Sequence, residues 1–211
     1  MKLYSGPLSM FGAKAQIALG EKGGEKGINF ELEMVPFSLK TLYEPKHEVV
    51  ARVNPKGQVP VLVDGDLEIF DSTQIFEYLE DKFPTPALWP ADPVARARAR
   101  QWELKSDEVF FSHVITLMSQ FGDTEAIAAL NACYELLETH MAERAYIAGD
   151  FTYADIAFYV ASFFAGFLGA PIPQNCANLQ AWRDRVADRP AVVQVMVPMR
   201  AYLDENGLKS A

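Results

Sequence analysis

Over the first 83 residues the spacing of apolar positions changes between two-residue and helical periods. MKLY (1–4) and INFELEMVPF (28–37) predict strands, the second because apolar and polar residues alternate along it. VPVLV (59–63) and LEIF (67–70) predict a hairpin across the turn DGD. Apolar residues at helical spacing predict helices over 9–22 and 72–82. Strands and helices in this order predict a small α/β layer.

From Val94 onward only the helical spacing remains. FPTPALWPADP (83–93) holds four prolines, which deprive helices and sheets of N–H donors, so it reads as a linker. We therefore expect an α/β domain over 1–83, a linker over 84–93 and an all-helical domain over 94–211. The helices expected there cover 95–121, 124–144, 152–168 and 178–190, the last stopped by Pro190, with a final stretch over 192–206 interrupted at Pro198.

The most apolar run, IAFYVASFFAGFLGAPI (156–172), carries no charge. It is shorter than the roughly 20 residues that a transmembrane helix needs, it contains two glycines and a proline, and it has no basic flank. We therefore predict a helix buried on all sides. Thr152 and Asp155, just before the run, have the spacing of a capping box and predict the start of this helix.

Composition narrows the function classes. The formal net charge of -9 argues against non-specific binding to nucleic acid or to an anionic membrane. MKLYSGPLSM (1–10) lacks the basic and apolar regions of a signal peptide. Two cysteines outside any CxxC pair, Cys133 and Cys176, fit a reducing cytosol, so we expect a cytoplasmic protein. His47, His113 and His140 are scattered, and we predict no metal site.

The segment GEKGGEKG (20–27) repeats four residues in tandem. We interpret it as a tolerated duplication in the loop after the first helix, because lengthening a loop costs little free energy. Either copy can provide the C-cap of that helix, and we assign the repeat no function.

An acid and a hydroxyl, Asp71 and Ser72, stand where the helix over 72–82 begins. The first N–H groups of a helix lack intrahelical partners and carry positive potential, so this end can hold a carboxylate. The alternative is that the two residues act only as N-cap residues, and both roles can hold at once.

Three stretches carry a resemblance to a known family: KLYSGPLSMFGAKAQIALGEKG (2–23), NPKGQVPVLVDGDLEIFDSTQIFEYLEDKFP (54–84), and YIAGDFTYADIAFYVASFF (146–164) followed by LQAWRDRVADRPAV (179–192). In this order and spacing the chain resembles the serine-type, bacterial-like cytosolic glutathione transferases over nearly its whole length. The resemblance implies a thioredoxin-like α/β N-terminal domain, an all-α C-terminal domain and a homodimer. It also implies glutathione as co-substrate, with no metal.

The resemblance assigns glutathione contacts to six residues. Val59–Pro60 matches the family's cis-proline, which turns the backbone of Val59 towards the cysteinyl part of the peptide, as in an added strand; a plain strand-opening proline is the alternative. Ser72 and the helix N–H groups would take the γ-glutamyl carboxylate, and Asp71 would serve its ammonium. Gln58 matches a contact to the ligand backbone, and Lys46 matches a basic residue for the glycyl carboxylate.

A transferase of this kind must lower the pKa of the glutathione thiol, which is about 8.5 when unperturbed, because the thiolate is the nucleophile. Ser9 stands at the position of the family's catalytic serine and would donate a hydrogen bond to the thiolate; a simple helix N-cap is the alternative. Ser5 and Tyr4 are fallbacks. Residues 1–83 contain no cysteine, which argues against the cysteine-type classes. Met10 replaces the proline common after this serine, and Lys14 is the nearby cation in place of an arginine.

The second substrate is expected to be an apolar electrophile. Phe110, Phe111 and Met118 are candidates for its pocket, although such residues more often fill a core. Glu103 and Asp107 are both candidates for an acid that reaches the ligand's ammonium across a dimer interface. Two alternatives stay open: a non-catalytic binding or scaffold protein with the same fold, and a glutathione-dependent peroxidase or isomerase using the same site.

Overall fold

The computed structural model describes residues 1–23 and 27–206. These divide into two compact units, one formed by 1–87 with 190–202, the other by 88–189 with 203–206. The first holds a mixed sheet and the second is helical, which confirms the predicted fold class. Of the repeat GEKGGEKG, residues 24–26 lie outside the described part, so the prediction made for this loop is not addressed there.

The sheet of the first unit has the strand order β2-β1-β3-β4. Its strands are β1 (Lys2–Ser5), β2 (Glu31–Met34), β3 (Val61–Asp64) and β4 (Leu67–Phe70). The central strand β1 pairs in parallel with β2 and antiparallel with β3, with Leu3 opposite Leu62. The predicted hairpin is present, and Gly65 at its turn has a φ of 65°, which glycine adopts without steric cost.

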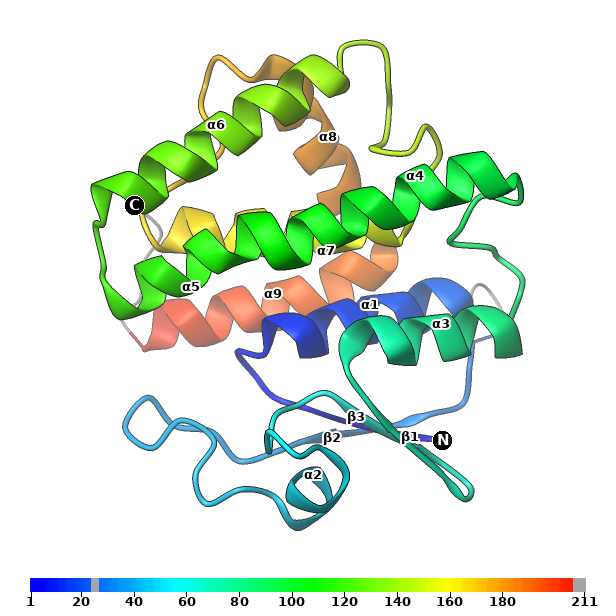
Figure 1. The fold of residues 1–211 in the computed structure, drawn as a ribbon. Coiled ribbons are helices and arrows are strands. Elements are labelled where there is room, and N and C mark those ends of the chain that lie inside the picture. Colours follow the sequence, from blue (N-terminus) through cyan, green and yellow to red (C-terminus); the bar gives the residue numbers. More distant parts are fainter. Residues whose placement is uncertain (24–26, 207–211) are drawn as a thin grey trace. The chain divides into compact units, whose positions relative to one another are not determined.

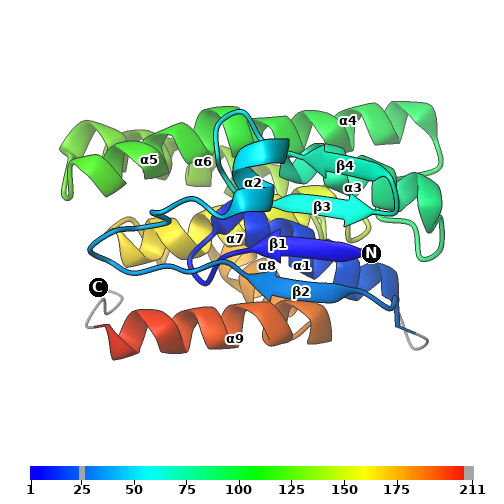
Figure 2. The same ribbon diagram turned by 90° about the horizontal axis from the view of Figure 1, so that it is seen from below.

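Two helices cover one face of this sheet, α1 (Met10–Gly23) and α3 (Ser72–Lys82), and α2 (Glu48–Val53) covers the other (Figures 1 and 2). The sequence analysis missed α2, a six-residue helix whose three valines have low helix propensity. Tertiary packing overrides this preference, because Val50 is buried in a cluster with Tyr4 and Val61.

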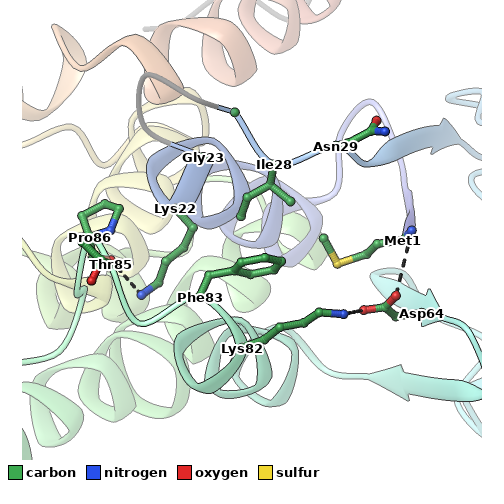
Figure 3. Close-up of a pocket in the computed structure, with 11 residues that line it drawn as sticks. Met1, Lys22, Gly23, Ile28, Asn29, Asp64, Lys82, Phe83, Thr85 and Pro86 are labelled. Carbon is green, nitrogen blue, oxygen red and sulfur yellow. Dashed lines mark hydrogen bonds and ion pairs between the residues drawn. The ribbon is translucent and has the colours of Figure 1, made fainter.

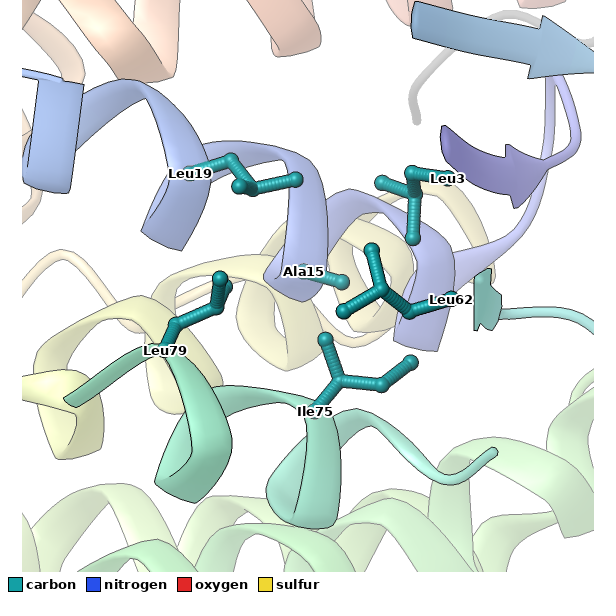
Figure 4. Packing of buried hydrophobic residues seen from close by; sticks show 6 residues of the cluster. All are labelled: Leu3, Ala15, Leu19, Leu62, Ile75 and Leu79. Carbon is teal, nitrogen blue, oxygen red and sulfur yellow. The ribbon is translucent and has the colours of Figure 1, made fainter. Parts of the chain in front are cut away.

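The main core of this unit lies between β1, β3 and the two helices (Figure 4). Every member of the cluster is at most 1% exposed: Leu3, Ala15, Leu19, Leu62, Ile75 and Leu79. Burying a leucine or isoleucine side chain stabilises a fold by roughly 1.5–3 kcal/mol, so this cluster holds α1 and α3 firmly against the sheet.

The second unit is built from helices: α4 (Pro93–Leu104), the π-helical turn η2 (Lys105–Phe110), α5 (Phe111–Ser119), α6 (Thr124–His140), α7 (Tyr153–Phe167) and α8 (Ala177–Ala187). The helix predicted over 95–121 therefore runs without a break from α4 through η2 into α5, which ends at Ser119, with a π-helical segment in its middle. Most of α7 is buried, as predicted for the apolar run. Among the described helices, none has the length and apolarity that a membrane crossing requires.

The predicted capping box at the start of α7 is confirmed, and it belongs to a larger buried network. The carboxylate of Asp155, which is fully buried, accepts hydrogen bonds from the backbone N–H groups of Thr152 (2.8 Å) and Ile147 (2.9 Å). It also accepts one of 2.9 Å from the indole N–H of Trp182 on α8. One acid thus joins the start of α7 to α8 and to the preceding loop.

The last helix, α9 (Pro190–Glu205), differs from its prediction at Pro198. Pro198 lies inside a continuous helix and does not interrupt it, and Met196 and Met199 on either side of it are buried. Residues 190–202 group by their packing with the first unit. The reason is close packing at Gly20 of α1, where an added Cβ would lie 2.8 Å from the Cβ of Ala191.

Candidate functional site

The predicted site residues Ser9 and Ser72 stand at the N-terminal ends of α1 and α3. Figure 1 shows these two helices running in the same direction along the sheet, so their N-terminal ends face the same side of the unit. Unpaired N–H groups and positive helix potential are therefore gathered at one end. Such an end suits an anionic ligand.

Ser9 precedes α1 and is 7% exposed. Its hydroxyl oxygen accepts a hydrogen bond of 2.9 Å from the backbone N–H of Gly12, and its own N–H donates to the carbonyl of Gly6 at 3.1 Å. Among the described residues, no acceptor lies in hydrogen-bonding geometry with the Ser9 O–H. The residue therefore caps the helix through its oxygen, and this bond does not use its O–H as a donor.

Ser5, the fallback for Ser9, is fully buried at the end of β1. Its hydroxyl accepts a hydrogen bond of 2.8 Å from the side-chain amide of Gln16 on α1. Both hydroxyls border Gly12: a Cβ added there would lie 2.1 Å from the Ser5 oxygen and 2.8 Å from the Ser9 oxygen. The sequence analysis did not identify Gly12 or Gln16. A glycine inside a helix often marks a place where a neighbouring group packs closely, and this signal could have identified Gly12.

The Val59–Pro60 peptide bond is cis, as the resemblance implied. Neither the N–H nor the C=O of Val59 has a hydrogen-bond partner among the described residues, so both can pair with an extended peptide. The preceding turn is ordered by buried Asn54, another residue that the sequence analysis missed. Its side-chain amide donates to the carbonyl of Gln58 at 2.6 Å, and its oxygen accepts from the N–H of Lys56 at 2.9 Å.

At the start of α3, Asp71 is the N-cap residue and Ser72 is 1% exposed. The Asp71 carboxylate accepts hydrogen bonds from the backbone N–H groups of Thr73 (3.0 Å) and Gln74 (3.1 Å). The capping role is therefore present, and two of the helix N–H groups considered for a ligand carboxylate are already taken. Asp71 has a φ of 75°, which is uncommon for a residue with a Cβ and is found mostly at functional sites.

Lys46 lies in the segment before α2, and Tyr4 of β1 contacts His47 in the same segment. Lys46 is partly exposed, forms an ion pair of 3.1 Å with Glu44, and lays its stem along Gly57 in the turn before Val59. Tyr4, the other fallback for Ser9, is buried in the sheet, with its ring centroid 5.2 Å from that of His47. Lys46 is thus placed beside the turn before Val59, whereas Tyr4 is part of the core.

The candidates for an electrophile pocket belong to the helical unit. Phe110 and Phe111 are 1% and 3% exposed, and the Phe110 ring packs edge-on against Tyr134 at 5.2 Å and Phe158 at 5.7 Å. Met118 is 59% exposed. The burial of both phenylalanines favours the core role that the sequence analysis left open, and their pocket role stays a prediction. Of the acids considered, Glu103 is buried and Asp107 is half-buried.

A hollow of about 810 Å³ lies at the opposite ends of α1 and α3, close to their last residues (Figure 3). Lys82 forms an ion pair there with Asp64, whose carboxylate also accepts a hydrogen bond of 2.6 Å from Tyr78. The Lys22 ammonium is paired with Glu80 and donates to the carbonyl of Pro86 at 2.8 Å. Both lysines are thus paired within the protein. The hollow is separate from the candidate site, because it lies at the C-terminal ends of α1 and α3 and the site lies at their N-terminal ends. The described residues contain no group of three or more His, Cys, Asp or Glu side chains that could hold a metal ion.

Comparison with known proteins identifies two matching family models. The model described as glutathione S-transferase, N-terminal domain, matches residues 3–87, and the model described as glutathione S-transferase, C-terminal domain, matches residues 118–190. Together they match well over half of the chain and include the segments that hold Ser9, Val59 and Ser72.

Individual relatives extend this similarity. Glutathione S-transferase 3 of Zea mays is 30% identical over 90% of each chain. A stringent starvation protein A homolog of Coxiella burnetii is 29% identical over 84% of this chain and 82% of its own length. Among solved structures, a glutathione S-transferase from the Antarctic clam Laternula elliptica is 26% identical, with a TM-score of 0.79 over 92% of this chain and 90% of its own.

Proposed function

Because this chain belongs to the glutathione S-transferase family, we propose that it binds glutathione at the N-terminal ends of α1 and α3 and conjugates the glutathione thiolate to an apolar electrophile. Members of this family use glutathione as a substrate. The proposal includes a homodimer, expected from the resemblance, and a cytoplasmic location, expected from the two cysteines outside any CxxC pair. Thiolate sulfur forms the new bond to the electrophilic carbon, the leaving group departs with its bonding pair, and the thiol proton passes to solvent.

The observation that carries this proposal is the hydrogen bonding of Ser9. Its oxygen is engaged by the N–H of Gly12, and its proton has no acceptor among the described residues. A hydroxyl in this state donates to a thiolate without first breaking a bond within the protein. Hydrogen bonds to ionised groups are about twice as strong as neutral ones, and each unit of thiol pKa corresponds to about 1.4 kcal/mol. One such bond, with the positive end of α1, lowers the thiol pKa towards neutrality.

The peptide part of glutathione is assigned to the neighbouring groups. The free backbone N–H and C=O of Val59 would pair with its cysteinyl unit, and the Ser72 hydroxyl with the first N–H of α3 would hold its γ-glutamyl carboxylate. Asp71 would hold the ammonium while still capping α3. Gln58 and Lys46 would contact the ligand backbone and the glycyl carboxylate.

The proposal is tested by titrating purified protein with glutathione in a calorimeter and by measuring conjugation to a chloronitrobenzene. We expect wild type to bind and turn over, Ser9→Ala to bind with a large loss of rate, and Ser72→Ala to bind weakly. Ser119→Ala, which removes an exposed hydroxyl from α5, is the matched control and is expected to behave as wild type. Failure of wild type to bind glutathione contradicts the proposed site.

A second candidate function, a binding role without turnover, is favoured by the similarity to the stringent starvation protein A homolog. The departures after Ser9 are consistent with it. Met10 replaces a proline, and Lys14 is buried with its ammonium 5.4 Å from the ring of Phe11. Glutathione binding with no turnover across a panel of electrophiles, peroxides and isomerisable substrates would support this role. Turnover of a peroxide or an isomerisable substrate alone would favour the peroxidase or isomerase alternative at the same site.

A further inference from the structure

The loop between β2 and α2 forms a tight, ordered turn. The N–H of Ser38 donates to the carbonyl of Leu42 at 3.0 Å, and the N–H of Leu42 donates back to Ser38 at 2.7 Å. The hydroxyls of Ser38 and Thr41 share a further hydrogen bond of 2.7 Å. Leu42 has a φ of 53°, a left-handed conformation that is rare for a leucine. Strained backbone of this kind is concentrated at functional sites, where it holds a neighbouring side chain in place.

The side chain that follows this strained residue is Tyr43, and its ring lies against the turn that leads to Ser9. A Cβ added to Gly6 would lie 2.3 Å from Cε1 and 2.5 Å from the hydroxyl oxygen of Tyr43. The ring also packs against that of Phe37, with centroids 4.7 Å apart. The carbonyl of Gly6 accepts the N–H of Ser9 at 3.1 Å. The glycine therefore lets the phenol approach the backbone of the turn that positions Ser9.

The hydroxyl of Tyr43 is buried and makes no hydrogen bond of normal geometry to any residue of the described part of the chain. Burial raises the pKa of this phenol to about 12, although the backbone of Leu8 acts in the opposite direction. The group is therefore a neutral O–H donor throughout the neutral pH range. A buried donor without an acceptor is unfavourable and calls for an explanation, such as a ligand that supplies the acceptor.

We propose that Tyr43 is a second hydroxyl donor of the Ser9 site, which donates a hydrogen bond to the sulfur of bound glutathione. The proposal rests on the proposed function. Ser9 would donate to the sulfur from the start of α1, and Tyr43 from the loop that packs against Gly6. A thiolate accepts more than one hydrogen bond, and each bond favours the anion over the thiol. No proton is transferred to or from the phenol, because it acts as a donor in both the bound and the reacting states.

The test compares Tyr43→Phe with wild type. Phenylalanine keeps the ring packing against Gly6 and Phe37 and removes only the oxygen. The ultraviolet absorbance of the bound thiolate, followed against pH, reports the pKa of bound glutathione directly. We expect that pKa to rise by about one unit. At a pH below the thiol pKa of wild type, the thiolate fraction and kcat/KM should then fall by about tenfold. Melting temperature should stay equal or rise, because an unpaired buried hydroxyl has been removed.

Two comparisons separate the outcomes. Tyr146→Phe, in the helical unit, removes the hydroxyl of another partly buried tyrosine and should leave the thiol pKa unchanged. Ser9→Ala should raise the thiol pKa. An unchanged thiol pKa in Tyr43→Phe, with a raised one in Ser9→Ala, overturns the role of Tyr43 and leaves the proposed function standing. A fall in melting temperature with no change in thiol pKa assigns Tyr43 a structural role. Absence of glutathione binding by wild type overturns both proposals.

Discussion

The hydroxyl oxygen of Ser9 accepts a hydrogen bond from the backbone N–H of Gly12, so the residue proposed to activate the thiol also begins α1. Removing an N-cap hydroxyl costs about 1 kcal/mol of stability. We therefore expect Ser9→Ala to lower the free energy of unfolding by about this amount, in addition to its effect on rate, as measured by urea denaturation. Ser9→Thr retains both the acceptor and the donor, and should keep most of the stability and the rate. Equal stability of Ser9→Ala and wild type would contradict the capping role.

At Gly12 we expect the general preference for alanine over glycine inside a helix to be reversed. Alanine is usually favoured over glycine inside a helix by up to about 1 kcal/mol. At Gly12 the new methyl group would overlap the Ser5 oxygen at 2.1 Å, so Gly12→Ala should destabilise the protein and weaken glutathione binding. Gly166 on α7 is the matched control, because a Cβ there meets its nearest atom at 3.8 Å. Thermal denaturation should show that Gly166→Ala is neutral or stabilising. A stabilised Gly12→Ala variant would show that the Ser5 side chain yields without cost.

Asp71 combines a capping role with a proposed ligand contact, and two substitutions separate them. Asn keeps an acceptor for the N–H groups of Thr73 and Gln74 and tolerates positive φ, but it lacks the charge for the ligand's ammonium. We expect Asp71→Asn to melt close to wild type and to bind glutathione about tenfold more weakly. Asp71→Ala should lose both stability and affinity. Calorimetry that finds equal affinity for Asp71→Asn would restrict Asp71 to capping.

Asp155 is expected to be the most sensitive position of the helical unit. Its replacement by alanine leaves the donors on Ile147, Thr152 and Trp182 buried without an acceptor. Each unsatisfied buried donor costs about 1–3 kcal/mol, so Asp155→Ala should lose at least about 3 kcal/mol. Trp182→Phe removes one of the three donors and should cost less. If the two changes act through one network, the double variant in urea denaturation will lose less than the two single losses combined.

His140 should make stability depend on pH. Burial lowers the pKa of its imidazole, although the carbonyl of Ile147, 2.8 Å from Nε2, acts in the opposite direction. The folded state therefore favours the neutral ring. Its contribution to stability is fully present above the unfolded pKa of about 6.5 and is lost as pH falls through the folded pKa.

We expect the free energy of unfolding of wild type to fall more between pH 7.5 and 5 than that of His140→Gln, which keeps a side-chain donor for Ile147 without titrating. The comparison concerns the slope against pH, because the variant also loses the ring contact with Trp102. Parallel slopes would show that the two states hold this histidine with equal pKa.

The sequence by itself determined the elements whose signals are local. The helix over 72–82 was predicted with its bounds because Asp71 and Ser72 mark its start and its apolar residues keep one face. The hairpin around Gly65 and the capping box of Thr152 and Asp155 were equally readable, since each depends on residues within a few positions of one another.

Tertiary structure decided the features that depend on partners distant in the chain. The valines of α2 disfavour a helix, and the burial of Val50 against the sheet overrides this preference. The helix α9 continues through Pro198, next to the buried side chains of Met196 and Met199. Nothing local predicts that Tyr43 packs against the turn before Ser9, because the contact is made with Gly6, 37 positions earlier. Local patterns determine backbone conformation over a few residues, whereas the proximity of side chains is determined by the packing of the whole unit.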